Sequence, residues 1–501
     1  IDKEQIFNSA ADLADVSQRA AYLDQACGND AQLRAEIEEL LRHDGDAGSF
    51  LDQPAVNSCP TIAIGEFDSV DEFAHGAAGR LEEGYHADNV LMTTFAGFML
   101  LVSMNSTHAS IQFASALSTA PETQAAARDV CARALADFDG TPDLAFLFFS
   151  SHHVENADTA SALVCDAIGT DSLLGCSGES IVGVGQEVEL EPAMSLWLAR
   201  LPGTSVWPMR LEYQRAADEG AFVGWPEELP DDWSDKAALI VLGDPFSLPA
   251  DLLLELVNNE HPGVPVIGGM ASAGQTPGSN RLLLGRNLFE QGAAAVLLQG
   301  DVQVTSVVSQ GCRPFGQHFV ITKAQRNIIQ ELGGMPAYRR LEELFQTLPT
   351  HDQQMVQRGL HVGRVVSEYQ DQFEQGDFLI RNVVGVDPEE GSIAISDYVR
   401  PGQTVQFHIR DANTADAELR QLLSRVENPV AAGLLFTCNG RGTKLFSEPH
   451  HDATAIKNAV GDIPLAGLFA AGELGPIGGK NFVHGFTASI ALFQAASEAA
   501  D

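Results

Sequence analysis

The sequence predicts an α/β fold in which repeated strand, helix, strand, strand units form two packed α/β halves, preceded by a small all-helical segment. Short apolar runs that end in glycine are typical of buried strands, and three such runs recur along the chain in similar surroundings. The chain has 501 residues, whereas one hydrophobic core rarely serves more than roughly 250 to 300 residues. We therefore expect more than one domain.

Composition and charge narrow the range of partners. The chain is 45% apolar and 19% charged, which is typical of a packed globular protein. Its 68 acidic and 29 basic residues give a formal net charge of -39, and a surface of this sign repels phosphate backbones and anionic lipids. We expect no nucleic-acid partner and no attachment to a membrane.

Cysteine and histidine usage favours a reducing compartment without a metal site. The seven cysteines are scattered and include no CxxC pair, so neither a disulfide framework nor a zinc cluster is indicated. The histidine pairs at 152–153 and 450–451 are adjacent residues, which point to opposite faces of a strand and rarely bind one ion together. We predict a cytoplasmic protein without a metal or another cofactor.

Residues 1–56 predict a small bundle of amphipathic helices. Within them, the sequence AAYLDQACGNDAQLRAEIEELL resembles the helical segment that precedes the catalytic domain of bacterial, planctomycete-type serine/threonine kinases. Kinase catalysis needs a glycine-rich loop, a strand lysine and a DFG aspartate, and the chain carries none of these motifs. The resemblance therefore implies a docking segment for a signalling protein rather than a kinase.

Residues 57–110 predict a linker or adaptor without a recognisable signature. The run Asn89–Thr107 is rich in apolar residues, but its strongly apolar part is shorter than the about 20 residues that span a bilayer and contains Thr93, Thr94 and Gly97. We expect a buried or interfacial helix there.

The repeat is visible from residue 144 onward. Each copy begins with an apolar strand, continues into a helix and ends in a glycine-rich strand. Gly175 follows Phe146 by 29 residues, and Gly268 follows Leu239 by the same spacing. The three copies start at LAFLFFSS (144–151), AALIVLG (237–243) and GLLFTC (433–438), with helices expected at 160–168, 248–258 and 452–460.

Two further helices frame these copies. An alanine-rich stretch predicts a helix over 121–135. The segment 336–348 predicts an amphipathic helix with Leu341, Leu344, Phe345 and Leu348 on one face, and we place the junction of the two halves there. The halves are then residues 111–335 and 336–501.

The first candidate site lies at the glycine-rich strand ends of the first half. GCSGES places Cys176, Ser177, Gly178 and Glu179 where a turn can offer backbone N–H groups and side-chain acceptors to a small ligand. Gly268 and Gly269 end the second copy in the same way. The alternative is a tight structural turn whose glycines only adopt positive φ.

Arg313, in SQGCRPFG, can pair with a ligand carboxylate through its planar guanidinium. The alternative partner is one of the protein's own acidic residues, which are abundant.

The C-terminal blocks supply the second candidate site. Polar residues stand at the ends of apolar runs, namely Cys438, Arg441, Glu473 and His484. Strand alternation along FVHGFTASI would place His484 on one face with Phe482 and Phe486, so a buried core histidine is the alternative. Cysteine, histidine and glutamate are also the residue types of a nucleophile, its base and an orienting acid.

Four of these blocks, between Ile111 and Phe493, resemble the FIST family in its N and C sensory domains: LLGCSGESIVGVGQEVE, SQGCRPFG, GLLFTCNGRG and PLAGLFAAGELGPIGG with FVHGFTASI. The resemblance implies a cytosolic signal-transduction module that binds a small ligand, such as an amino acid or a derivative, in a glycine-rich pocket between copies. The alternatives are a protein-interaction scaffold without a ligand and a cysteine-dependent hydrolase or transferase. We expect a binding module rather than an enzyme, with no catalytic residue assigned.

Overall fold

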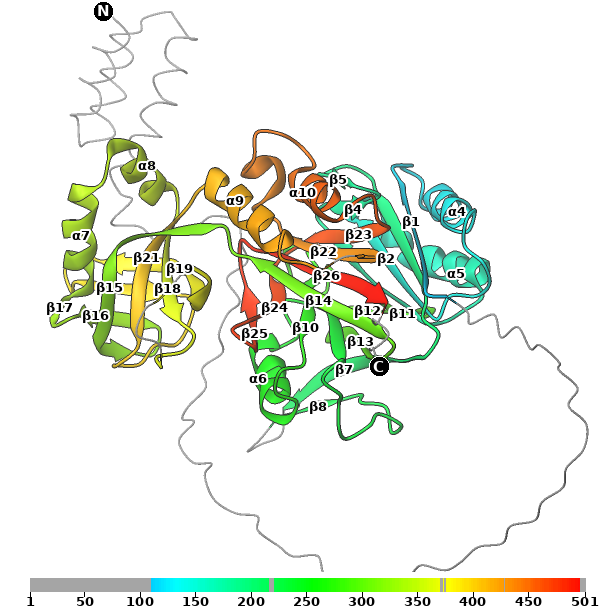
Figure 1. The fold of residues 1–501 in the computed structure, drawn as a ribbon, viewed down its shortest axis with the longest axis horizontal. Helices are drawn as coiled ribbons and strands as arrows, with labels where there is room; N and C mark the ends of the chain where they lie inside the picture. Colours follow the sequence, from blue (N-terminus) through cyan, green and yellow to red (C-terminus); the bar gives the residue numbers. More distant parts are fainter. Residues whose placement is uncertain (1–109, 216–219, 370–372, 374, 428, 496–501) are drawn as a thin grey trace, which may run out of the picture.

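The computed structural model describes residues 110–215, 220–369, 373, 375–427 and 429–495 (Figure 1). The helices predicted for 1–56, the linker before residue 110 and the apolar run at 89–107 lie outside these residues. Within the described ranges, no helix is long and apolar enough to cross a membrane. The α/β class and the repeated units predicted from the sequence are confirmed.

The first unit forms most of a six-stranded sheet with two helices on it. All seven residues of its central strand β2 are buried, and Glu122 caps α4 by accepting hydrogen bonds from the backbone N–H groups of Gln124 and Ala125. The elements are β1 (Gln112–Ser118), α4 (Thr123–Ala134), β2 (Leu144–Ser150), η1 (Ser151–Asn156), α5 (Ala157–Ile168), β3 (Leu173–Gly178), β4 (Ile181–Gly183), β5 (Gln186–Val188) and β6 (Met194–Arg200).

The second unit repeats this order with a single helix. Its elements are β7 (Thr204–Arg215), β8 (Gly220–Val223), β9 (Ala238–Gly243), α6 (Ala250–Glu260), β10 (Val266–Met270), β11 (Leu282–Leu284), β12 (Asn287–Phe289) and β13 (Ala293–Gly300).

The third unit is interrupted after its first strand by an inserted domain. Its own elements are β14 (Val302–Ser309), α9 (Ala412–Leu423), β22 (Ala432–Cys438), η3 (Gly442–Lys444), α10 (His451–Val460), β23 (Leu465–Ala470), β24 (Glu473–Ile477), β25 (Lys480–His484) and β26 (Ala488–Ala495). The strand alternation predicted along 482–490 is wrong at 485–487, where strand structure is interrupted between β25 and β26 and Phe486 has a positive φ of 65°.

The three units are joined by an exchange of hairpins. In each sheet the unit's first, last, second and third long strands lie in that order, and a hairpin from another unit completes the sheet. Hairpin β11–β12 joins the first unit's sheet, β24–β25 joins the second unit's sheet, and β4–β5 joins the third unit's sheet. The exchange is cyclic, so no unit has a complete sheet without its neighbours.

The inner faces of the three sheets share one hydrophobic core. Its buried residues come from all three units and include Trp197, Ile240 and Phe436. Phe113 at the start of β1 lies 5.8 Å from Phe493 near the end of β26, ring centre to ring centre. The first and last strands of the described fold are therefore neighbours in the core, as the cyclic arrangement requires.

The insertion is a barrel that stands beside the three units (Figure 1), in which six strands of a seven-stranded sheet form a closed ring and β17 extends it at β16. A pairing between β15 and β16 closes the sheet, and helices α7 and α8 pack against it. The amphipathic helix predicted at 336–348 is α7, and the predicted junction of the two halves falls inside this barrel. Its elements are β15 (Cys312–Gln325), β16 (Ile328–Leu332), β17 (Met335–Pro336), α7 (Ala337–Thr347), α8 (Thr350–Arg358), β18 (Leu360–Val365), η2 (Gln375–Asp377), β19 (Phe378–Asp387), β20 (Ser392–Ile395) and β21 (Thr404–Arg410).

Polar contacts fasten the barrel to the third unit. The Gln310 side chain donates to the Phe378 carbonyl at 2.7 Å and accepts from the Ile380 N–H at 3.0 Å, so it imitates a strand neighbour of β19. Arg381 on β19 donates to the Val483 carbonyl on β25 at 2.7 Å. The barrel therefore contacts β24–β25, the hairpin by which the third unit completes the sheet of the second unit.

A glycine marks one matched position in every unit. Gly175, Gly268 and Gly467 pair across the parallel strands with Leu147, Val241 and Leu435. A Cβ on any of the three would overlap the carbonyl oxygen of its strand partner, and Gly268 also has a φ of 156°.

Replacing this glycine should disrupt the fold. We expect Gly268→Ala to lower the free energy of unfolding by about 3 kcal/mol, because the methyl group meets backbone that has no room to move. Gly376→Ala is the control, since a Cβ there has no atom within 4 Å. Urea unfolding followed by circular dichroism measures both, and equal stabilities would contradict the packing described.

Candidate ligand-binding site

The matched glycines allow the three hairpins to be compared position by position. Glu473 on β24 lies across from the residue that follows the central glycine of the sheet it joins. Ile181 on β4 and Leu282 on β11 occupy that same place. Two units thus bury an aliphatic side chain where the third buries a carboxyl group.

One of the two carboxyl oxygens of Glu473 has a hydrogen-bond partner among the described residues and the other has none. Its side chain is fully buried, and Oε2 accepts a hydrogen bond from the Thr487 N–H at 3.0 Å. Oε1 has no partner among the described residues. Burial first, and then the neighbouring Cys438, raise the pKa of Glu473 well above its usual 4.5, which favours the protonated acid.

His484 departs from the other units in the same way. It faces Glu473 across the hairpin, where Val188 faces Ile181 and Phe289 faces Leu282. Its Nε2 bonds to the Gly475 carbonyl at 2.9 Å, while Nδ1 has no partner within the described part of the chain. Burial lowers the pKa of His484 to about 4, so the ring is neutral near pH 7.

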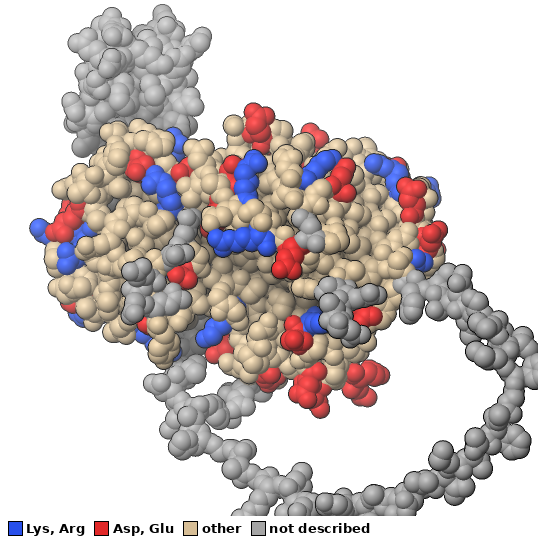
Figure 2. Space-filling view, in the orientation of Figure 1, with Lys and Arg blue, Asp and Glu red and all other residues tan. Residues whose placement is uncertain are grey.

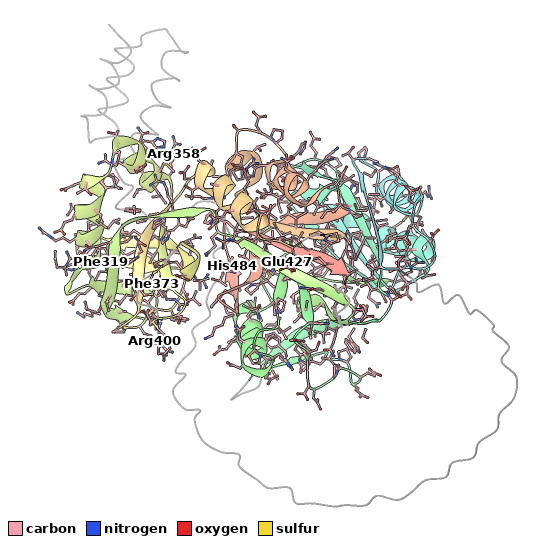
Figure 3. The ribbon with its side chains drawn as sticks, viewed as in Figure 1. Phe319, Arg358, Phe373, Arg400, Glu427 and His484 are labelled. Carbon is pink, nitrogen blue, oxygen red and sulfur yellow. The ribbon has the colours of Figure 1, made fainter. Side chains whose placement is uncertain are left out.

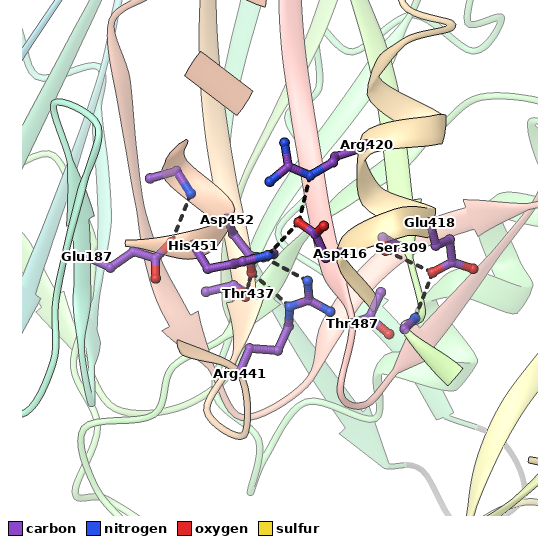
Figure 4. Close-up of polar contacts among 12 residues, drawn as sticks. Glu187, Ser309, Asp416, Glu418, Arg420, Thr437, Arg441, His451, Asp452 and Thr487 are labelled. Atoms are coloured by element: carbon purple, nitrogen blue, oxygen red, sulfur yellow. Dashed lines mark hydrogen bonds and ion pairs between the residues drawn. The ribbon is translucent and has the colours of Figure 1, made fainter. Parts of the chain in front are cut away.

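Arg441 follows the end of β22 and is fully buried. Its Nε and Nη2 bind the two carboxylate oxygens of Asp452 at 2.8 and 2.7 Å, and Thr437 donates to the same carboxylate at 2.7 Å (Figure 4). Burial alone would raise the pKa of Asp452, but Arg441 and these hydrogen bonds lower it well below its usual range. Nη1 of Arg441 has no partner among the described residues.

The first unit reaches into this network through its exchanged hairpin. Glu187 on β5 accepts a hydrogen bond from the Ala453 N–H at 2.8 Å, at the start of α10. Burial and then Asp452 raise the pKa of Glu187 to about 8. On the other side, His451 stacks on Phe446 and bonds to Asp416 at 2.9 Å.

The barrel closes the site with Arg410, at the end of β21. Its Nη2 donates to the Gly440 carbonyl at 2.8 Å, and its guanidinium lies 4.3 Å from the centre of the Phe486 ring. His361 on β18 meets the other edge of Phe486 at 5.1 Å between ring centres. In Figure 3, His484 accordingly lies between the barrel and the three-unit body.

Buried polar atoms without partners concentrate at this junction. Of the fifteen such atoms among the described residues, seven lie here, namely Arg410 Nε, Arg441 Nη1, Glu473 Oε1, Asn439 Oδ1, His361 Nδ1, His408 Nε2 and His484 Nδ1. The other eight include His153 Nε2 and Trp233 Nε1 elsewhere in the fold. Such atoms are costly unless something binds them, and natural proteins contain few. We define the junction site as Cys438, Arg441, Glu473, His484 and Arg410.

The other predicted residues lie elsewhere. Cys176 and Ser177 are fully buried in β3, where burial raises the pKa of the Cys176 thiol far above its usual 9.0. Gly178 packs against Leu468 of the third unit, and the exposed end of the motif, Glu179, pairs with Lys444 at 2.7 Å. This motif forms the contact between the first and third units.

Gly269 similarly packs against Ala470, and Gly268 occupies the matched tight position of the strand pair. Arg313 binds two of the protein's own carboxylates, Asp352 at 2.6 Å and Asp411 at 3.3 Å. Arg313 was predicted to bind either a ligand carboxylate or one of the protein's own acidic residues, and the structure shows the protein's own.

Sequence reasoning missed Arg410, Asp452 and Glu187. Arg410 carries no glycine-rich signature, because it ends a barrel strand far from the repeat. Aligning the three hairpins by their central glycines would have singled out Glu473 and His484 as polar residues in apolar positions.

Other kinds of site find less support. The described residues include no group of three His, Cys, Asp or Glu side chains placed to hold a metal ion. One half-open hollow of about 340 Å³ lies on the first unit, lined by Leu117, Ser118, Thr119, Ala120, Asp129, Arg133, Val184 and Gln186. On the face in Figure 2, basic side chains are interspersed with acidic ones.

Three hairpin-exchanged α/β units with a barrel inserted into the third define a two-part α/β module. Comparison with known families finds the FIST N domain at residues 143–335 and the FIST C domain at 337–476. The chain belongs to the FIST family, whose domains are sensory domains in signal transduction.

Similar full-length relatives occur in mycobacteria. The uncharacterized protein Rv0628c of Mycobacterium tuberculosis H37Rv is 42% identical over 382 residues, which cover 75% of this chain and 98% of the relative. The uncharacterized protein Mb0898c of Mycobacterium bovis is 39% identical over 380 residues, covering 75% of this chain and 97% of the relative.

Glu187 makes stability depend on pH. Its pKa is raised on folding, so its stabilising contribution is complete below about pH 4.5 and is lost as the pH rises through about 8. Burial lowers the pKa of His361, His408 and His484, which acts in the opposite direction up to about pH 6.5. Between about pH 6.5 and 8 we therefore expect the free energy of unfolding to fall by up to about 1.4 kcal/mol per pH unit for the Glu187 proton. Glu473 acts in the same direction.

The Glu187→Gln variant should show a flatter dependence in denaturant unfolding measured across this range. The surface variant Glu390→Gln should retain the slope of the wild type. Identical slopes in wild type and Glu187→Gln would contradict the assignment.

Proposed function

We propose that this protein is a cytoplasmic sensory module that binds a small ligand, an amino acid or a derivative of one, at the junction site. The observation that supports this most strongly is the placement of Glu473 and His484. Both are buried at positions that are aliphatic or aromatic in the other two units. Burying polar groups there lowers stability, and ligand recognition supplies a reason to keep them.

The chemistry of the site suits a ligand with both a carboxylate and an amine. Arg441 offers one unpartnered N–H at Nη1, and carboxylates accept strongly from guanidinium groups. The protonated Glu473 would ionise when an ammonium group approaches its free Oε1, because an opposite charge lowers a carboxyl pKa. His484 contributes a neutral nitrogen beside it.

The barrel is the element that would report occupancy. Arg410, Arg381 and His361 contact the third unit beside the site. A ligand that engages Arg410 or displaces Phe486 changes these contacts, and so shifts the barrel relative to the three units. The segment 1–56 would pass that change to a signalling protein.

Cysteine-dependent catalysis is the weaker candidate. A reactive thiol needs a lowered pKa, usually from a nearby cation or base. Arg410 and Arg441 are cations near Cys438, but neither candidate base is suited to take its proton. The pKa of Glu473 is raised well above 4.5 by burial, which favours the protonated acid, and Nε2 of His484 bonds to the Gly475 carbonyl. A scaffold without a ligand leaves the unpartnered polar atoms unexplained.

A thermal-shift screen with L-amino acids and their derivatives tests the proposal. A ligand at 100 times its Kd should stabilise the fold by about 2.7 kcal/mol. The decisive variant is Cys438→Ser with Glu473→Leu, which combines the serine of the first unit at the Cys438 position with the leucine of the second unit at the Glu473 position. In the first unit Ser150 takes the place of Cys438 and accepts from the Ala193 N–H at 3.0 Å, the counterpart of the Thr487 N–H.

We expect this double variant to fold and to show no shift with the ligand of the wild type. Glu390→Leu, the same change on the surface, should keep the full shift. A double variant that binds as well as the wild type would exclude the junction site. No shift with any compound would favour the scaffold.

A further inference from the structure

Arg410 is a largely enclosed cation without an acidic partner. Within the described residues its polar contact is the Gly440 carbonyl, its aromatic contact is Phe486, and its Nε is unpartnered. None of the ion pairs of the described chain includes it. A guanidinium removed from water without a counter-ion is costly, so its position calls for an anion.

Arg441 adds a second donor to the same place. It is fully buried, and Asp452 occupies its Nε and Nη2, which leaves Nη1 directed elsewhere. Arg410 Nη2 bonds to the carbonyl of Gly440, the residue before Arg441, and burial and the charge of Arg441 lower the pKa of Arg410. Both therefore present a free N–H within one small region.

The acids around them do not neutralise Arg410. Glu473 has its pKa raised by burial and favours the protonated form. Glu418 on α9 has its pKa raised by burial as well, and its Oε2 is engaged by Ser309 and the Gly311 N–H at 2.8 and 2.7 Å. Asp452 pairs with Arg441, so no carboxylate of the described residues forms an ion pair with Arg410.

Glycines lie close against both guanidiniums. A Cβ on Gly440 would come within 3.0 Å of Arg410 Nη1, and a Cβ on Gly311 within 3.1 Å of Arg441 Nη1. These distances are tighter than ordinary carbon contacts, so larger residues would crowd the donors. The stacked Phe486 ring fixes the plane of Arg410.

We propose that Arg410 and Arg441 form an anion subsite that holds the carboxylate of the ligand, with Arg410 Nε and Arg441 Nη1 as the two donors. This inference rests on the proposed function and adds the charge of the ligand and the role of Arg410. A monoanion fits best, because one positive charge is uncompensated and Asp452 would repel a second negative charge. Arg410 is partly exposed while Arg441 is not, so the ligand enters past Arg410.

The test compares acids with their uncharged amides on the full chain. The probes are formate, acetate, benzoate, glycine and L-alanine, each paired with its primary amide, and sulfate serves as a dianion. Binding is measured by calorimetry and thermal shift at constant ionic strength. We expect at least one acid to bind, and its amide to bind about 10- to 100-fold more weakly, since charge-assisted hydrogen bonds are lost.

Variants separate the subsite from general charge effects. Arg410→Gln should weaken binding of the acid by a similar about 10- to 100-fold factor and leave amide binding unchanged. Arg339→Gln, at an exposed arginine of α7, should change neither. If Arg410→Gln does not fold, the comparison of acids with amides on the wild type decides.

Each other outcome has a definite meaning. Equal binding of acids and amides, or an unchanged affinity in Arg410→Gln, overturns the anion subsite. If an uncharged compound binds the wild type but not the Cys438→Ser/Glu473→Leu variant, the junction site is supported although the anion subsite is overturned. Failure of every acid, amide and other metabolite to bind overturns both.

Discussion

The cyclic exchange of hairpins is the constraint on which the rest of the structure depends. Each sheet is completed by two short strands from another unit, and the three inner faces share one core. No unit can therefore bury its apolar strands alone, which explains why three copies occur together. The exchange also carries Glu187 from the first unit to helix α10 of the third, and Glu473 with His484 from the third unit to the sheet of the second.

Because the three units share one register, they act as internal controls for one another. Positions that are aliphatic or aromatic in two hairpins are Glu473 and His484 in the third. The third unit is also the one that receives the barrel, and the barrel brings Arg410 to the same place. At these two positions the fold thus has apolar residues twice, and Glu473 and His484 once, in the unit where a second domain can respond. Departures of this kind from an otherwise consistent pattern are expected at functional sites.

The sequence predicted what depends on local pattern. Apolar runs, their spacing and the glycines at their ends predicted the three strand and helix copies and the helices α4 and α7. They also indicated the importance of Gly175 and Gly268. The break after His484 was missed because glycine and threonine within an apolar run resemble a continuous strand, while Phe486 turns with a positive φ. The barrel and Arg410 were missed because closure of a sheet depends on pairing between distant strands. Cys438, Arg441, Glu473 and His484 lie near one another, whereas Cys176, Ser177 and Arg313 take part in other contacts.

The central claim is that the third unit binds the ligand and that the first two are its unoccupied copies. Hydrogen–deuterium exchange with and without a stabilising carboxylate measures this most directly. The account predicts slower exchange at 408–411, 438–442 and 473–487 on addition of the ligand, with no change at the matched segments 150–154 and 181–193 or at 244–247 and 282–292. Equal protection of all three units, or protection confined to the hollow on the first unit, would contradict it.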